Sequence, residues 1–264
     1  MKEISTIPVF SLNNADKNDF MLRNMNSLTQ LHLKNCFEYK SLMEKFENIK
    51  QSYDSLLDIP FIPVRLFKYS NLLSIEKKDI VKTMTSSGTS GQSVSKIFLD
   101  KETASLQIKV LSKIMADFIG KKRLPMLIID SKSIISNREK FSARTAGVLG
   151  FSIFGRNVEF ALNDDMTFNY ERVESFLKKY ESESILIFGF TFIIWKHFVL
   201  ELEKADKKLN LSTSILLHGG GWKQLDNQSV DNIEFKNRIL NISSISKIHN
   251  YYGMVEQTGS IFVE

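Results

Sequence analysis

The 264-residue sequence is short of three features: it has one cysteine, no long apolar run and no segment typical of a secretory signal. A membrane-spanning helix needs roughly 20 consecutive apolar residues, and none of the apolar runs approaches that length. The first residues lack the apolar core and the small-residue cleavage site of a signal peptide. The single cysteine, Cys36, excludes an internal disulfide and fits a reducing compartment. Together these absences predict a cytoplasmic protein without a transmembrane segment.

The sequence also has little that points to nucleic acid or to a structural metal. Its formal net charge is +5, but the lysines are scattered. The densest basic clusters, at 121–123 and 204–208, are typical of solvated helix ends, and no recognised nucleic-acid motif accompanies them. The four histidines and the single cysteine do not share the spacing of metal ligands, which argues against a structural zinc site.

Helices and strands alternate through most of the chain. Helical spacing runs from residue 16 to residue 57, and the two prolines of segment 59–67 favour an extended connector. Later helices are expected at 101–119, 171–180, 192–204 and 230–240, and strands at 125–130, 184–190, 214–218 and 247–252. This alternation predicts an α/β fold with a largely parallel sheet and helices on both faces. We expect a helical leader with its connector at 1–68 and an α/β core at 69–264.

Segment 85–91, with the sequence TSSGTSG, is the most informative stretch of the chain. Its two glycines can take backbone angles that line up N–H groups, and its five hydroxyl side chains can donate to phosphate oxygens. The flanking segments 79–84 and 94–99 are expected to be strands, which places it at the tip of a strand–loop–strand unit. The spacing of a Walker loop is absent. A phosphate-binding loop and an ordinary flexible hairpin both remain open.

Two further clusters follow expected strands, where open α/β sheets place their ligands. Segment 218–223 is HGGGWK, and its three consecutive glycines let a flat ligand approach the backbone. Segment 251–259 is YYGMVEQTG, which offers an aromatic face for a base, a glycine for close approach and a carboxylate able to hold Mg²⁺. Each cluster also has a structural interpretation. The first can be a tight strand-to-helix turn, and the second a strand end that leads into a hairpin at 260–264.

The order and character of the three clusters resemble those of adenylate-forming ligases, which carry a Ser/Thr/Gly loop, a glycine-containing adenine strip and a Tyr-Gly-x-x-Glu segment. Within that superfamily the chain resembles the LuxE family, the acyl-protein synthetase subunit of bacterial fatty-acid reductase. Four stretches carry the resemblance: the connector 60–68, the loop 86–91, the strip 218–223 and segment 252–259. The resemblance implies the N-terminal large domain of an adenylate-forming enzyme, preceded by the short helical leader.

The resemblance further implies ATP-dependent activation of a carboxylic acid, expected to be a fatty acid, to an acyl-adenylate. In the complete family the acyl group then passes to a protein thiol. The loop would cradle the β- and γ-phosphates, with Thr89 acting in catalysis and Lys96 as an assisting cation. The loop residues assigned to ATP are Ser86, Ser87, Gly88, Thr89, Ser90 and Gly91. The wider superfamily has Pro-Lys soon after the last glycine, whereas Ser93 and Val94 stand here.

By the same resemblance, the residues that would contact the adenine base are Gly219, Gly220, Gly221, Tyr252 and Gly253. The three consecutive glycines would form its edge, and Tyr252 would stack on its face. Glu256 would hold Mg²⁺ between the phosphates and lower the charge barrier to carboxylate attack. His218 would orient the acyl carboxylate or polarise the mixed anhydride, although a histidine at a strand end is structural as often as chemical.

The chain matches about the first two-thirds of the family pattern and ends at Glu264. The family's ribose-binding aspartate, mobile lysine and acyl-accepting cysteine have no candidates in it. Two interpretations therefore stay open. The first is an adenylating enzyme, or its larger domain, whose thiol acceptor lies on another domain or protein. The second is a truncated relative that binds a nucleotide or a partner subunit without turnover, with a partner chain or dimer mate covering the terminal strand.

Some residues that invite a chemical role are expected to be structural instead. Cys36 lies among the expected N-terminal helices, and a small buried residue is favoured over an acyl acceptor. The apolar run 188–195 can line an acyl channel or belong to the core, and the core is favoured. His249 is expected to be a packed core residue. The sequence leaves open the acyl chain length, the oligomeric state and the pathway, including light emission.

Overall fold

The computed structural model describes residues 6–8, 11–45, 49–86, 93–136, 143–222, 229–258 and 260–264. The chain divides into two compact units. The first comprises residues 1–117 with 253–261, and the second comprises residues 118–252 with 262–264. The expected division at residue 68 between a leader and a core stays a prediction. None of the described helices combines the length and apolar character that crossing a membrane requires.

The first unit begins with two capped α-helices. Asn13 caps α1 (Asn14–Asn35), because its side-chain oxygen accepts a hydrogen bond from the backbone N–H of Asp16 at 2.9 Å. The Cys36 sulfur does the same for α2 (Phe37–Met43), accepting from the backbone N–H of Tyr39. Cys36 is only 2% exposed, which confirms that it is a small buried residue. Short 3₁₀ turns follow: η2 (Leu56–Asp58), η3 (Val64–Lys68) and η4 (Lys77–Asp79).

An antiparallel hairpin and a long helix complete the first unit. Strands β1 (Lys82–Thr85) and β2 (Lys96–Leu99) pair with Thr85 opposite Lys96, which confirms the predicted strand–loop–strand unit. Helix α3 (Lys101–Ile119) begins at the predicted residue, and its last two residues belong to the second unit. The Asp100 carboxylate accepts a hydrogen bond from the backbone N–H of Thr103 at 2.7 Å and so caps this helix.

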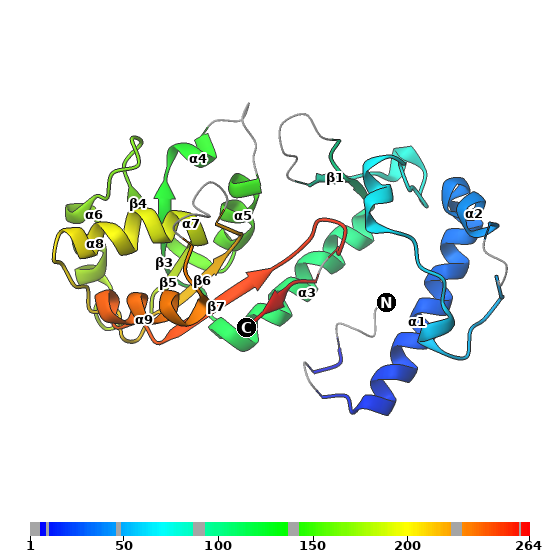
Figure 1. The fold of residues 1–264 in the computed structure, drawn as a ribbon, viewed down its shortest axis with the longest axis horizontal. Coiled ribbons are helices and arrows are strands. Elements are labelled where there is room, and N and C mark those ends of the chain that lie inside the picture. The colour runs from blue at the N-terminus through cyan, green and yellow to red at the C-terminus, as the bar shows by residue number, and fades with distance from the viewer. Residues whose placement is uncertain are drawn as a thin grey trace. The chain divides into compact units, whose positions relative to one another are not determined.

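Among the described residues, the second unit is built on a six-stranded sheet in the order β4-β3-β5-β6-β7-β8 (Figure 1). All neighbours are parallel except β7 and β8, which are antiparallel. The strands are β3 (Leu124–Ser131), β4 (Gly155–Leu162), β5 (Leu186–Phe190), β6 (Ile215–Gly219), β7 (Lys247–Tyr252) and β8 (Phe262–Val263). Every residue of β5 and β6 is buried, as expected for strands covered on both faces. This confirms the α/β fold with a largely parallel sheet.

Helices cover both faces of the sheet. The Phe188 ring stacks on Phe151 of α5, with centroids 4.9 Å apart, whereas the adjacent Gly189 packs against Ile194 of α7. Successive strand residues point to opposite faces, so α5 and α7 lie on opposite sides. The helices of this unit are α4 (Ser133–Ser136), α5 (Ala143–Ser152), α6 (Tyr170–Lys179), α7 (Thr191–Ile194), α8 (Leu200–Lys204) and α9 (Asn232–Ser243), with a π-helical turn, η6 (Trp195–Val199), joining α7 to α8.

The strand order reverses at the centre of the sheet. From β3 the chain moves outward to β4, then returns to pair β5 on the other side of β3, and continues outward through β6 and β7. The connections that leave β3 and β5 therefore diverge. In open α/β sheets such a divergence opens a crevice at the carboxyl ends of the strands, where ligands bind.

Two features of the second unit are not predicted from sequence. Strand β4 lies at the sheet edge, and it carries Asn157 in the left-handed region at φ +49° and an exposed Val158, so it lacks a continuous apolar run. The expected helix 192–204 is present, but the π-helical turn interrupts it. The apolar run at 188–195 is confirmed as core at Phe188, Ile194 and Trp195, each at most 2% exposed.

Two glycines on α5 give a matched test of this packing. A Cβ atom at Gly147 would lie 2.8 Å from Cζ of the buried Phe190, whereas one at Gly150 meets nothing within 4 Å. Alanine gains helix propensity at both positions, so that gain cancels in the comparison. We expect Gly147→Ala to unfold with a free energy about 1–3 kcal/mol lower than Gly150→Ala. Urea titrations of both variants measure the difference, and equal stabilities would contradict the tight contact.

Candidate functional site

Glycines at the end of β6 lie against aromatic rings of the two neighbouring strands. A Cβ atom at Gly219 would lie 2.4 Å from Cε1 of Tyr251 on β7. Gly220 has a φ of +79°, and a Cβ there would lie 2.9 Å from Cδ1 of Phe190 on β5. A Cβ at Gly221 meets nothing within 4 Å in the described part of the chain. Packing therefore requires glycine at the first two positions, and none of the described residues occupies the space beside Gly221.

The rings that contact these glycines belong to an aromatic wall on the α5 face of the sheet. Phe151 lies 4.5 Å from Tyr251 and 4.9 Å from Phe188, measured between ring centroids. Phe188 in turn meets Phe190 edge to face at 6.1 Å. Burial raises the pKa of Tyr251, so its hydroxyl stays neutral. The wall backs the carboxyl ends of β5, β6 and β7.

His218 faces the other side of the sheet and is held by Thr191, the first residue of α7. Its Nδ1 lies 2.9 Å from the Thr191 hydroxyl, which also donates to the carbonyl oxygen of Gly219 at 3.2 Å. A hydroxyl has only one proton to donate, so Nδ1 must carry a proton and donate to Thr191. Nε2 is then the acceptor nitrogen. It is buried, and no described residue offers it a hydrogen bond.

The surroundings of His218 keep the imidazole neutral. Burial lowers its pKa to about 4, and the charges of Lys236 and His249 contribute in the same direction. At neutral pH the imidazole is therefore uncharged. It can still accept a hydrogen bond. The predicted role of His218 in orienting or polarising the acyl group stays a prediction, restricted by this geometry to Nε2.

An aromatic cluster ties the glycine strip to the helices on the same side as His218. The Phe235 ring on α9 lies 4.7 Å from the His218 ring and 6.2 Å from Trp222, which follows the glycines. Trp222 meets Trp195 of the π-helical turn edge to face at 5.3 Å. Arg238 stacks over Trp195, with its guanidinium carbon 4.3 Å from the ring centroid. Both ends of the strip are therefore anchored to packed helices.

Tyr252 and Gly253 lie where β7 ends. Tyr252 is 58% exposed, and its ring lies 6.4 Å from that of Phe262 on β8. An exposed ring is what base stacking needs, so the structure is compatible with the predicted contact. The chain passes from the second unit to the first at Gly253, where an added Cβ would lie 3.0 Å from Cγ2 of Ile261.

In the first unit, Ser86 closes the base of the predicted phosphate loop. Its N–H donates to the carbonyl oxygen of Ser95 at 3.1 Å, and its hydroxyl accepts from the Ser95 N–H at 2.9 Å. The predicted loop residues Ser87, Gly88, Thr89, Ser90 and Gly91 lie outside the described residues. Lys96 is exposed on β2. The paired strands β1 and β2 thus lie on either side of this segment in the chain, as the sequence predicts.

Glu256 lies in a turn of the first unit and is half-buried. Where side chains are described, no three His, Cys, Asp or Glu residues are grouped closely enough to hold a metal ion by themselves. Mg²⁺ at phosphate-transfer sites is commonly bound by one or two carboxylates together with substrate phosphates. A single carboxylate at Glu256 fits that donor set, and its role as the metal ligand stays a prediction.

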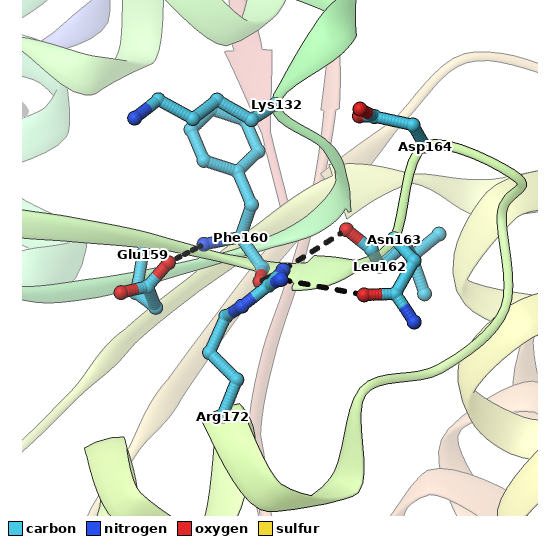
Figure 2. A pocket seen from close by; sticks show the side chains of 7 residues that line it. All are labelled: Lys132, Glu159, Phe160, Leu162, Asn163, Asp164 and Arg172. Atoms are coloured by element: carbon cyan, nitrogen blue, oxygen red, sulfur yellow. Dashed lines mark hydrogen bonds between the residues drawn. The ribbon is translucent and has the colours of Figure 1, made fainter.

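A polar cavity of about 350 Å³ lies beside β4 (Figure 2), and none of its lining residues belongs to a predicted motif. Its lining residues are Lys132, Glu159, Phe160, Leu162, Asn163, Asp164 and Arg172. Nη1 of Arg172 donates to the carbonyl oxygens of Phe160 and Leu162 at 3.1 and 3.2 Å, and Nη2 donates to Oδ1 of Asn163 at 3.3 Å. Arg172 therefore fastens α6 to the end of β4 with three of the five N–H donors of its guanidinium.

Sequence reasoning missed two residues that shape the strip, Thr191 and Tyr251. Thr191 directly follows the apolar strand 186–190, and a hydroxyl at that position is a signal for a strand-end contact. The sequence predicts an aromatic face in segment 251–259 but no role for Tyr251 itself. Strand alternation sends it to the buried wall and its neighbour Tyr252 to the surface.

The fold matches that of solved ligases. A crystal structure of an open conformation of 2-hydroxyisobutyryl-CoA ligase in complex with 2-HIB-AMP and CoA aligns with a TM-score of 0.66 at 14% identity, covering 95% of this chain and 53% of that one. The same ligase in its thioesterification state aligns with a TM-score of 0.62 at 13% identity, covering 94% and 51%. This chain thus spans about half the length of that ligase. At these identities the likeness shows the fold alone: the chain shares its architecture with about half of that ligase.

The family model of LuxE acyl-protein synthetase matches residues 4–262. The chain belongs to the LuxE acyl-protein synthetase family, which confirms the resemblance based on its four motifs. No curated protein sequence matches the chain.

The burial of His218 predicts a pH dependence of stability. Its pKa is near 6.5 in the unfolded chain and about 4 in the folded one, so between these values the unfolded state binds more protons. The contribution of His218 to the free energy of unfolding is therefore greatest above pH 6.5 and falls as the pH is lowered toward 4. We expect the wild type to lose about 3 kcal/mol more than His218→Asn between pH 7 and pH 4, by urea titration. Asparagine keeps a donor near the Nδ1 position. Equal losses would show that His218 titrates normally.

Proposed function

We propose that the chain forms an acyl-adenylate from a carboxylic acid and ATP. The observation that carries the proposal is the LuxE acyl-protein synthetase match over residues 4–262. The ligase with the same fold was crystallised with an acyl-adenylate, 2-HIB-AMP, which supports the same class of intermediate. In the reaction, a carboxylate oxygen attacks the α-phosphorus of ATP. The bond from that phosphorus to the bridging oxygen then breaks, and pyrophosphate leaves.

The phosphate groups would be held by the loop 87–91 at the tip of the hairpin, with Lys96 as a nearby cation. The two hydrogen bonds between Ser86 and Ser95, one between backbone groups and one from the Ser95 N–H to the Ser86 hydroxyl, support this role because they hold the two ends of the loop together. A loop closed at its base loses less conformational freedom when it wraps a ligand. Catalysis of this kind depends mainly on aligned reactants and on balanced charge.

The adenine base would lie beside Gly221 and on the exposed ring of Tyr252. Gly219 and Gly220 would shape its edge indirectly, since the Tyr251 and Phe190 rings occupy the space next to them. His218 would act through Nε2 as a hydrogen-bond acceptor. Its neutral state avoids placing a second cation where the charge of the substrates has to be balanced.

Glu256 would hold Mg²⁺ together with the phosphate oxygens of ATP. When bound, the ion supplies charge neutralisation for the phosphates. The half-buried carboxylate supports this assignment because partial burial strengthens its attraction for a cation.

We further propose that the acid is a fatty acid, that a protein thiol accepts the acyl group, and that the protein acts in the cytoplasm. The family description supports acyl transfer to protein. Cys36 is not the acceptor, because its sulfur is buried and caps α2. The thiol would come from another domain or protein.

The test is carboxylate-dependent exchange of pyrophosphate into ATP, with acids from acetate to palmitate. We expect exchange with one class of chain length, and its loss in a Gly88→Ala/Gly91→Ala variant, because alanine restricts the backbone angles that glycine allows. Calorimetry should show weaker ATP binding by the variant. Absence of exchange with every acid, while ATP still binds, would instead support a non-catalytic nucleotide-binding relative.

Tyr252 gives a second test of the pocket, with Phe262 as its matched control. Both rings are similarly exposed, 58% and 59%, and they lie on paired strands. We expect Tyr252→Ala to weaken ATP and AMP binding by about tenfold, because stacking on a base contributes about 1–3 kcal/mol. Phe262→Ala should leave both affinities within twofold. Equal effects of the two substitutions, measured by calorimetry, would remove Tyr252 from the adenine site.

A further inference from the structure

A buried carboxylate lies at the carboxyl end of β3, beside the point where the strand order reverses between β3 and β5. Asp130, the last residue but one of β3, has a side chain only 1% exposed. Its neighbour Ile129 packs toward Gly189, so Asp130 points to the opposite side, toward α5. One carboxylate oxygen, Oδ1, accepts a hydrogen bond from the backbone N–H of Ser131 at 2.7 Å. The other, Oδ2, has no hydrogen-bond donor among the described residues.

Arg144, on the first turn of α5, approaches this free oxygen. Its Nε lies 3.1 Å from Oδ2, and its side chain is 25% exposed. The Nε–H does not point at Oδ2, however, and both atoms stay without a hydrogen bond in the described part of the chain. The contact is thus an ion pair that leaves the buried Nε–H of Arg144 without an acceptor among the described residues. A guanidinium has five N–H donors in a fork that matches a carboxylate or a phosphate.

The energetics of this pair call for a further partner. Burial raises the pKa of Asp130, and the Arg144 charge opposes that rise only in part. A buried donor without an acceptor costs a large part of the strength of a hydrogen bond, so native proteins rarely leave one unmatched. An oxyanion bound to the guanidinium would satisfy its donors.

The pair lies where a substrate is expected. The strand order reverses between β3 and β5, and Asp130 is at the carboxyl end of β3. One turn after Arg144 on α5, Gly147 packs against the Phe190 ring at the end of β5. The guanidinium therefore lies on the helix face that borders the carboxyl end of β5, next to the aromatic wall.

We propose that Arg144 binds the carboxylate of the acid substrate, and that Asp130 is a positioning residue that holds the Arg144 side chain at the crevice. This inference rests on the proposed function, since it names the group that binds the acid. The arginine would neutralise a carboxylate that must approach a triphosphate of the same sign. The aromatic side chains of the adjacent wall carry no charge, so the Arg144 guanidinium would be the group that recognises the charge of the carboxylate.

Equilibrium binding tests the inference without any need for turnover. The probes are the acid that supports exchange best, or decanoate if none does, and the alcohol of the same chain length. We expect the wild type to bind the acid more tightly than the alcohol. Arg144→Gln should weaken acid binding by about tenfold to a hundredfold and leave alcohol binding within twofold, because only the hydrogen-bonded charge is lost. Arg144→Lys should keep part of the preference, since it keeps the charge but not the fork.

The control is Arg156→Gln, which removes an arginine paired with Glu183 at the amino end of β4. It should leave acid binding unchanged. In exchange assays, Arg144→Gln should raise the KM for the acid by a similar factor and leave the KM for ATP within twofold. A rise in the KM for ATP alone would overturn the assignment to the carboxylate in favour of a phosphate.

Two results separate the failure of this inference from the failure of the proposed function. A wild type that exchanges pyrophosphate but binds acid and alcohol equally well would overturn the inference and keep the function. A wild type that prefers the acid through Arg144 but never exchanges would keep the inference and overturn the function. If Arg144→Gln lowers stability in urea and weakens acid and alcohol alike, the pair is a structural anchor for α5 and the inference is wrong.

Discussion

Direct packing of aromatic rings onto glycine backbone is the constraint on which the candidate site depends. At the carboxyl ends of three neighbouring strands, Phe190 and Tyr251 occupy the volumes that side chains at Gly147, Gly219 and Gly220 would fill. The wall they form fixes the path of the glycine strip on one side of the sheet. The Thr191–His218 contact fixes it on the other. A strip held from both sides is pre-organised, and a pre-organised site orders fewer groups when a ligand binds.

Much of the fold follows from periodicity and burial. Strands β5, β6 and β7 are predicted within two residues of their bounds, because each is a short apolar run between helices. Strand β4 is missed, since an edge strand exposes part of its surface and a left-handed Asn157 breaks its pattern. The π-helical turn at Trp195–Val199 is missed because helical spacing alone does not distinguish one extra residue in a turn.

The candidate site is predicted less completely than the fold. Motifs identify the strip, Tyr252 and the hairpin that carries the loop, since glycines and hydroxyls concentrate there in the sequence. Asp130 and Arg144 do not belong to any motif, and they meet only because the start of α5 lies beside the end of β3 in the folded chain. The tautomer of His218 cannot be predicted from the sequence either, because it depends on which neighbouring atom accepts the single hydroxyl proton of Thr191.

The order of strands also governs how the sheet can be assembled during synthesis. Strand β3 is apolar along most of its length, and its partners β4 and β5 lie on opposite sides and arrive later in the chain. One edge of β3 therefore stays open until residues 186–190 have left the ribosome. Unpaired apolar strand edges promote aggregation, and parallel pairing over long sequence separations is slow. A shortened form of this unit that ends before β5 would leave one edge of β3 unpaired, and one that ends between β5 and β6 would leave one edge of the buried β5 unpaired.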